Sequence, residues 1–115
     1  MTSHGAECIE NDYRPQPPVG EAGVYVNDLA DGTVLELVTQ RHNYMLLKHT
    51  GSQVLILGHP MFCPEPVVVQ IVGSFATWPD SSPEPGFICQ GMYLMFKHPV
   101  YDRVTTSRIL EIRRI

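Results

Sequence analysis

The stretch QVLILGHPMFCPEPVVVQIVGSFAT, residues 53–77, decides the fold class of this chain. Its two flanks, 53–58 and 67–77, are near-continuous apolar runs, which are typical of strands with both faces covered. Between them lie three prolines, which restrict the φ angle and end the neighbouring ladders: Pro60, Pro64 and Pro66. The stretch therefore predicts two core strands joined by a stiff loop.

Strand signals continue on both sides of this stretch. Runs of β-branched and aromatic residues are bounded by Gly, Asn, Asp and Pro, at 23–29, 33–40, 44–49, 87–98 and 104–115. None of these runs has a helical period, and Gly91 predicts a bend or bulge inside the longest one. The sequence predicts an all-β protein, a small antiparallel β-barrel of six to seven strands, with a two-sheet β-sandwich as the alternative.

The N-terminal part differs from the rest in composition. Residues 1–20 contain three prolines, scattered polar residues and only isolated apolar ones. Such a segment buries too little surface to offset the entropy lost on ordering. We expect a flexible N-terminal arm at 1–20 and a single β domain at 21–115, although Ile9 and Tyr13 are candidates for docking on the domain or on a neighbouring subunit.

Charge and cysteine content limit the partners that we expect. The net charge is −4, which argues against a general attraction to nucleic acid. The late basic residues are best explained as a solvated strand edge: Lys97, Arg103, Arg108, Arg113 and Arg114. No apolar run approaches the roughly 20 residues of a membrane helix, and no signal peptide is apparent. Three widely spaced cysteines indicate reduced thiols, and we expect a cytoplasmic protein without membrane partners.

His59 and Cys63 in the proline-rich loop raise the question of a metal site. A structural zinc site takes four ligands, often in closely spaced pairs, and these two residues supply half of that number. Cys89 and His98 would have to complete the site, but an extended strand of nine residues separates them by roughly 30 Å. We expect no metal and no cofactor, with His59 and Cys63 as the alternative metal ligands.

The sequence shows no constellation of residues for catalysis. A nucleophilic cysteine needs a lowered pKa from a neighbouring histidine or a helix N-terminus, and the chain offers no obvious helix. Its carboxylates are scattered through different elements. A non-enzymatic protein is the favoured interpretation, while catalysis at a ligand site stays open.

Two polar stretches and one aromatic residue are candidates for a binding surface. TQRHNY, residues 39–44, offers four candidates at a hairpin tip: Arg41, His42, Asn43 and Tyr44. VTTSR, residues 104–108, places three hydroxyls beside Arg108, a combination suited to a phosphate or carboxylate. Trp78 either caps a barrel end or anchors a partner. The simpler explanations are a polar hairpin tip and the strand propensity of threonine.

The order of these pieces resembles a group of small, uncharacterised bacterial all-β proteins. The motifs that carry the resemblance read TQRHNY, GHPMFCPEP, ICQGM and TSRILEI here, within residues 33–115. TQRHN departs from the arginine-asparagine pair of that group by inserted residues. The resemblance implies a compact bacterial β domain and no particular activity.

The favoured function is therefore a non-enzymatic binding or assembly module. It would form a homodimer, or bind a protein partner, through the hairpin tip and the loops at 59–66 and 78–86. Runs such as VVVQIV, residues 67–72, exceed what a single small barrel needs to bury. The alternative is a β-barrel that holds a small ligand or metal with the 58–66 loop, using His59, Cys63 and Arg108.

Overall fold

The computed structural model describes residues 22–77 and 82–115. These form ten strands and a 3-10 helix: β1 (Gly23–Tyr25), η1 (Val26–Asp28), β2 (Val34–Thr39), β3 (Asn43–Thr50), β4 (Gln53–Leu57), β5 (Val67–Phe75), β6 (Glu84–Pro85), β7 (Phe87–Cys89), β8 (Tyr93–His98), β9 (Asp102–Thr105) and β10 (Ile109–Arg114). Trp78 and the expected arm at 1–20 lie outside the described residues. Within the two described ranges, no helix has the length and apolar character needed to span a membrane.

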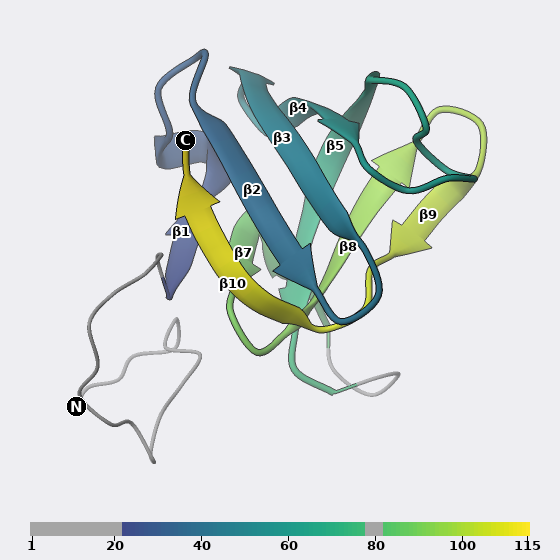
Figure 1. The fold of residues 1–115 in the computed structure, drawn as a ribbon. Helices are drawn as coiled ribbons and strands as arrows, with labels where there is room; N and C mark the ends of the chain where they lie inside the picture. The colour runs from purple at the N-terminus through teal and green to yellow at the C-terminus, as the bar shows by residue number, and fades with distance from the viewer. Residues whose placement is uncertain (1–21, 78–81) are drawn as a thin grey trace, which may run out of the picture.

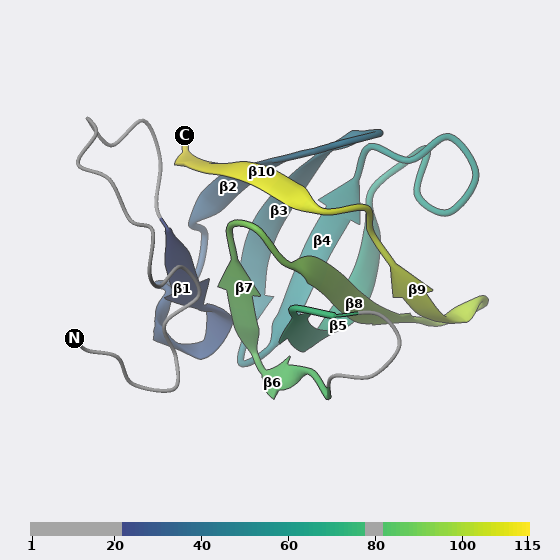
Figure 2. The same cartoon turned by 90° about the horizontal axis from the view of Figure 1, so that it is seen from below.

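The strands form one large antiparallel sheet and one small one. The large sheet has the order β10-β2-β3-β4-β5-β8-β9, with β6 paired to β5, and the small sheet pairs β1 with β7. The large sheet is strongly curled, and β9 and β10 form its two edges (Figures 1 and 2). The prediction of an all-β antiparallel protein is confirmed.

Two backbone hydrogen bonds join the start of β10 to the turn that precedes β8. The Gly91 N–H donates to the Ile109 carbonyl at 2.7 Å, and the Ile109 N–H donates to the Met92 carbonyl at 2.8 Å. No ladder joins β9 to β10 along the described chain, so the closed barrel is not confirmed. The ten strands exceed the expected six to seven because several are short pieces that a hydrophobic pattern does not separate.

Three of the expected strands are divided in the structure. The run at 87–98 is two strands, β7 and β8, because Gly91, at φ 88°, lies in a turn that carries the chain from the small sheet to the large one. The run at 23–29 contains β1 and η1, and the run at 104–115 contains the end of β9 and the whole of β10. The expected bend at Gly91 is therefore a turn between sheets.

The core lies between the inner face of the large sheet and the segment formed by β1, η1 and β7. Val54 and Ile56 on β4 and Val69 and Ile71 on β5 are buried there. The residues between them point outward, and Val68 is 43% exposed. The two apolar runs therefore supply the predicted core, and their outward residues are not covered by the described part of this single chain.

Lys48 is a charged residue on the inner face of β3. Its side chain is buried, and its ammonium donates to the Val26 carbonyl at 2.8 Å and to the Leu29 carbonyl at 2.7 Å. These two acceptors belong to η1 and the residue that follows it. The buried charge is thus hydrogen-bonded, as burial requires, and it attaches η1 to the sheet.

The two described cysteines differ in their covalent state. Cys63 is a buried free thiol, whereas Cys89 is disulfide-bonded. The expectation of reduced thiols is therefore wrong for Cys89. Because disulfides persist mainly in oxidising compartments, this bond also counts against the argument that led to a cytoplasmic location.

Candidate functional site

Two turns with the same local sequence pattern lie at one side of the large sheet (Figure 1). The first turn is HPMFC, residues 59–63, which follows β4, and the second turn is HPVYD, residues 98–102, which connects β8 to β9. In each, the first residue pairs with the fifth in antiparallel fashion. The repeated pattern of histidine, proline, apolar residue and aromatic residue is visible in the sequence, but the sequence analysis considered only the first turn.

The histidine ring closes each turn through the same pair of hydrogen bonds. His59 Nδ1 accepts the N–H of Met61 at 3.0 Å and that of Phe62 at 3.2 Å. His98 Nδ1 accepts the amides at the same two positions of the second turn, at 2.9 Å and 3.2 Å. An accepting Nδ1 leaves the proton of the neutral ring on Nε2. Both histidines therefore have a structural task that fixes their tautomer.

The two turns also pack against each other. His98 Nε2 donates to the Phe62 carbonyl at 2.8 Å, which ties the second turn to the first. The rings of Phe62 and Tyr101 meet edge to face with centroids 5.1 Å apart. His98 is buried. The two turns therefore pack as a single unit. Outside its own turn, each histidine contacts a different part of the protein.

The first turn meets the tip of the β2–β3 hairpin. The ring centroids of His42 and His59 are 4.3 Å apart, and those of Tyr44 and His59 are 6.5 Å apart. Partial burial, and secondarily His42, lowers the pKa of His59. The structure thus brings two predicted surface residues, His42 and Tyr44, to the proposed alternative ligand His59.

Tyr44 and Cys63 are buried beneath this cluster. Tyr44 is 1% exposed, so its side chain cannot contribute to the binding surface predicted at the hairpin tip, whereas Arg41 and Asn43 are exposed there. Burial, and then the neighbouring Cys63, raises the pKa of Tyr44 to about 12. Burial likewise raises the pKa of the Cys63 thiol, against the effect of its hydrogen bond to the His59 backbone. Both groups stay protonated at neutral pH, and a protonated thiol is a weak nucleophile.

Backbone hydrogen bonds make the first turn rigid. The Cys63 N–H donates to the His59 carbonyl at 3.0 Å, and the Gly58 N–H donates to the Cys63 carbonyl at 2.9 Å. Gly58 has a φ angle of 133°, and a Cβ there would lie 2.1 Å from the Asn43 carbonyl oxygen. Only glycine fits this close approach of the turn to β3. The spacing of His59 and Cys63 is therefore accounted for by the turn itself.

The described part of the chain holds no group of three or more His, Cys, Asp or Glu residues placed to bind a metal ion. His59 Nδ1 already accepts two backbone amides of the turn. Of the pair His59 and Cys63, only His59 Nε2 and the buried Cys63 sulfur are left as metal ligands. No third ligand from these residues extends the pair to a metal site.

The hydroxyls of VTTSR, residues 104–108, bond to the protein. Ser107 donates to the Thr39 hydroxyl at 2.9 Å and accepts the Arg41 N–H at 3.0 Å. Thr106 accepts the Leu94 N–H at 3.1 Å and donates to the Ser107 carbonyl at 2.7 Å. The Ser107 bonds attach the hairpin tip to the segment before β10, and the Thr106 hydroxyl attaches that segment to β8, so the two hydroxyls are not free for a phosphate.

Arg108 supports the turn that precedes β8. Its guanidinium donates to the Gly91 carbonyl and to the Tyr93 hydroxyl, each at 3.1 Å, and lies 4.9 Å from the centre of the Tyr93 ring. Its recorded side-chain contacts are therefore with this turn and not with His59 or Cys63. The structure does not join Arg108 to the first turn as the ligand-binding alternative requires.

The outer side of the large sheet carries an apolar surface that the sequence analysis assigned to buried strands. Four residues are consecutive cross-strand neighbours on β2 to β5, namely Val34, Leu47, Leu55 and Val68, and Met45 and Leu57 form the adjacent row. Leu47 and Val68 are 37% and 43% exposed. We call these six residues the apolar face; five of them line a shallow hollow with Pro66.

The chain matches no protein-family model, no curated protein sequence and no solved structure.

Proposed function

We propose that this protein is a non-enzymatic assembly module that forms a homodimer through its apolar face. The observation that carries the proposal is the unbroken apolar row across four neighbouring strands, with Leu47 and Val68 well exposed. Antiparallel sheets commonly present a polar outer side to water, so an apolar outer side favours a covering partner. Removing such surface from water stabilises association by about 25 cal/mol per Å².

The arrangement of the apolar face suits a second copy of the same chain. A two-fold axis parallel to the strands and between β3 and β4 would place β3 of one protomer over β4 of its partner. Leu47 would then face the partner's Leu55, and Met45 would face the partner's Leu57, because each pair shares a cross-strand row. The apolar face is thus self-complementary, as an isologous interface requires.

The edges of the large sheet are less suited to self-association than this face. The β10 edge carries Arg113 and Arg114, and the β9 edge carries Asp102 and Arg103, all exposed. Charged residues on edge strands oppose edge-to-edge pairing. This pattern supports contact through the face of the sheet.

The histidine cluster, which consists of His42, Tyr44, His59, Cys63 and His98, supports the non-enzymatic part of the proposal. Its thiol and phenol are protonated at neutral pH, and the Nδ1 atoms of His59 and His98 accept backbone hydrogen bonds. These groups hold the two turns in place. A general base or a nucleophile would need to be free and deprotonated.

We propose that the curled sheet is an incompletely closed barrel, supported by the hydrogen bonds between Ile109 and the Gly91–Met92 backbone. The bacterial origin rests on the resemblance in sequence, and the cytoplasmic location on the wide spacing of the three cysteines. The disulfide at Cys89 is the observation against that location.

Sedimentation equilibrium of the full chain, with and without Leu47→Glu, tests the proposal. We expect a dimer for the unmodified protein and a monomer for Leu47→Glu, because the charge would be buried in the interface. Leu110→Glu is the matched control, since Leu110 is 48% exposed on β10 and outside the apolar face. A monomeric unmodified protein, or a Leu47→Glu variant as dimeric as the control, would overturn the proposal.

A further inference from the structure

A row of polar residues runs beside the apolar row on the outer side of the large sheet. Gln53, Gln70, Lys97 and Arg103 are consecutive cross-strand neighbours on β4, β5, β8 and β9. Lys97 and Arg103 are therefore directly opposite each other. Like charges in this position destabilise a sheet unless an anion lies between them.

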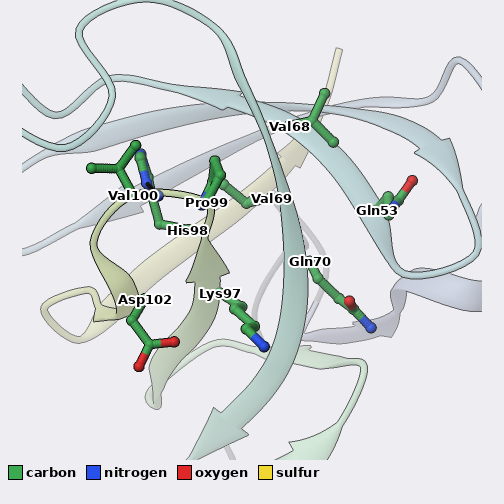
Figure 3. Close-up of a pocket in the computed structure, with 9 residues that line it drawn as sticks. All are labelled: Gln53, Val68, Val69, Gln70, Lys97, His98, Pro99, Val100 and Asp102. Atoms are coloured by element: carbon green, nitrogen blue, oxygen red, sulfur yellow. Dashed lines mark hydrogen bonds between the residues drawn. The ribbon is translucent and has the colours of Figure 1, made fainter.

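Neither cation has a carboxylate partner in residues 22–77 and 82–115. Arg103 contacts the Met95 sulfur at 3.5 Å, and Lys97 has no hydrogen-bond or ion-pair partner there. Asp102 lines a hollow with Lys97, but Figure 3 shows the Lys97 ammonium pointing away from the Asp102 carboxylate and in the same direction as Gln70. Among the described residues, the positive charge of the pair is thus left without a counter-charge.

The two cations line a groove of about 480 Å³ on the other side of Lys97. Three uncharged polar residues share its lining, namely Asn27, Ser52 and Gln70, and the apolar part of its wall includes Ile71, Val72 and two prolines of the segment before β7. None of the described lining residues is acidic. The size is within the range of small-molecule sites, and hydrogen-bond donors converge on it.

Backbone hydrogen bonds fix the walls of this groove. The Ile71 N–H donates to the Ser52 carbonyl at 2.8 Å, and the Gly86 N–H donates to the Val72 carbonyl at 3.0 Å. The register between β5 and β8 shifts between Ile71 and Gly73, which is a bulge at the edge of the groove. Bulges are frequent next to functional sites because they redirect side chains. Residues from four separate parts of the chain therefore surround the cation pair.

We propose that this groove binds a small molecule through its phosphate or carboxylate group, which lies between Lys97 and Arg103. The guanidinium provides paired donors for an oxyanion, and the ammonium adds a point charge. Gln70 and Ser52 donate or accept at the polar part of the ligand, and the proline wall contacts its carbon skeleton. The site is separate from the apolar face and requires neither a metal nor the histidine cluster.

Nuclear magnetic resonance titration of the full chain tests this site, with inorganic phosphate in one arm and succinate in the other. Sodium chloride keeps the ionic strength constant. We expect saturable shifts at the amides of Gln70, Lys97 and Arg103 in at least one arm, and at least tenfold weaker binding in Lys97→Met and Arg103→Met. Saturation in the phosphate arm alone assigns a phosphate ligand, and saturation in the succinate arm alone assigns a carboxylate ligand.

Arg41→Met is the matched control, because Arg41 is exposed at the hairpin tip and does not line the groove. It should bind the anion like the unmodified protein. Leu47→Glu should also retain binding, whatever its oligomeric state, which separates this site from the proposed dimer. Absence of saturation in both arms, or equal affinity in Lys97→Met and Arg41→Met, would overturn the proposal.

Discussion

The first turn and the second turn have the same local pattern but different surroundings. In both, the histidine accepts two amides of its own turn. His98 is buried and also donates to the Phe62 carbonyl, whereas His59 is partly exposed and lies against the ring of His42. The same local pattern therefore makes a buried link between turns at His98 and forms part of the surface at His59.

The fifth residue of each turn shows the same contrast. Cys63 is buried, whereas Asp102 is exposed and has a φ angle of 66°. Asp102 is the one described non-glycine residue with a positive φ angle. The comparison shows that a local motif sets the hydrogen bonds inside a turn, while the neighbouring strands decide which of its residues are buried.

Of the variants that test this difference between the turns, His98→Ala should lower the free energy of unfolding most. It removes the hydrogen bond that links the two turns. The change leaves two amides of the second turn and the Phe62 carbonyl without their partner. Since unmet buried groups cost about 1–3 kcal/mol each and some of these reach water, we expect a loss of about 3 kcal/mol in the free energy of unfolding. Urea denaturation measures this loss.

His98→Asn is the informative companion of that variant. The asparagine side-chain oxygen can accept the turn amides in place of Nδ1, but asparagine is too short to reach the Phe62 carbonyl. About half of the lost stability should return. If Asn were no better than Ala, the amide bonds to Nδ1 would not be the reason that the turn needs a histidine.

Asp102→Val should have the next largest effect, because a β-branched residue is a poor fit for a positive φ angle. The φ angle of 66° lies in the left-handed region, which aspartate tolerates better than valine does. We expect a loss of about 1–2 kcal/mol by thermal unfolding. Asp102→Gly serves as the control and should be close to neutral, and a loss as large as that of valine would point to the carboxylate instead of the backbone.

Much of this fold was accessible from the sequence, but the divisions of the strands were not. The apolar and β-branched runs predicted β2 to β5, and in the structure the inward residues of each strand recur at every second position. Gly91 suits both a bend within a strand and a turn between sheets. Its role depends on the pairing of β7 with β1, which is a long-range contact that a local pattern does not contain.

Some residues of the candidate site could also be predicted from the sequence, but their contacts could not. His42 and His59 were both recognised as candidates, and the structure places their rings 4.3 Å apart. The contribution of His98 follows from its hydrogen bond to Phe62, which joins positions 36 residues apart in the chain. Lys48 occupies an inward position that alternation predicts, but its carbonyl acceptors in and after η1 depend on tertiary packing.

His59→Ala should cost less than the same change at His98, because water can replace the lost acceptor at a partly exposed ring. We expect a loss of about 1 kcal/mol in the free energy of unfolding. His59→Asn should recover most of it, since the first turn needs only the acceptor. Urea denaturation of both variants checks this, and a loss equal to that of His98→Ala would remove the distinction between the two turns.

The smallest expected effect is the response of His59 to acid. Because burial and His42 lower its pKa in the folded protein, the unfolded chain binds the proton more readily. His59 therefore contributes stability above its unfolded pKa of about 6.5, and this contribution is lost as the pH falls through that value toward the lower folded one. Protonation of Nδ1 would also remove the acceptor for Met61 and Phe62.

The unmodified protein should lose more stability between pH 7.5 and pH 5 than His59→Asn does, as measured by denaturation at each pH. Equal slopes for the two proteins would show that the exposed ring adapts to its charge, and the first turn would then differ from the second in mobility as well as in burial.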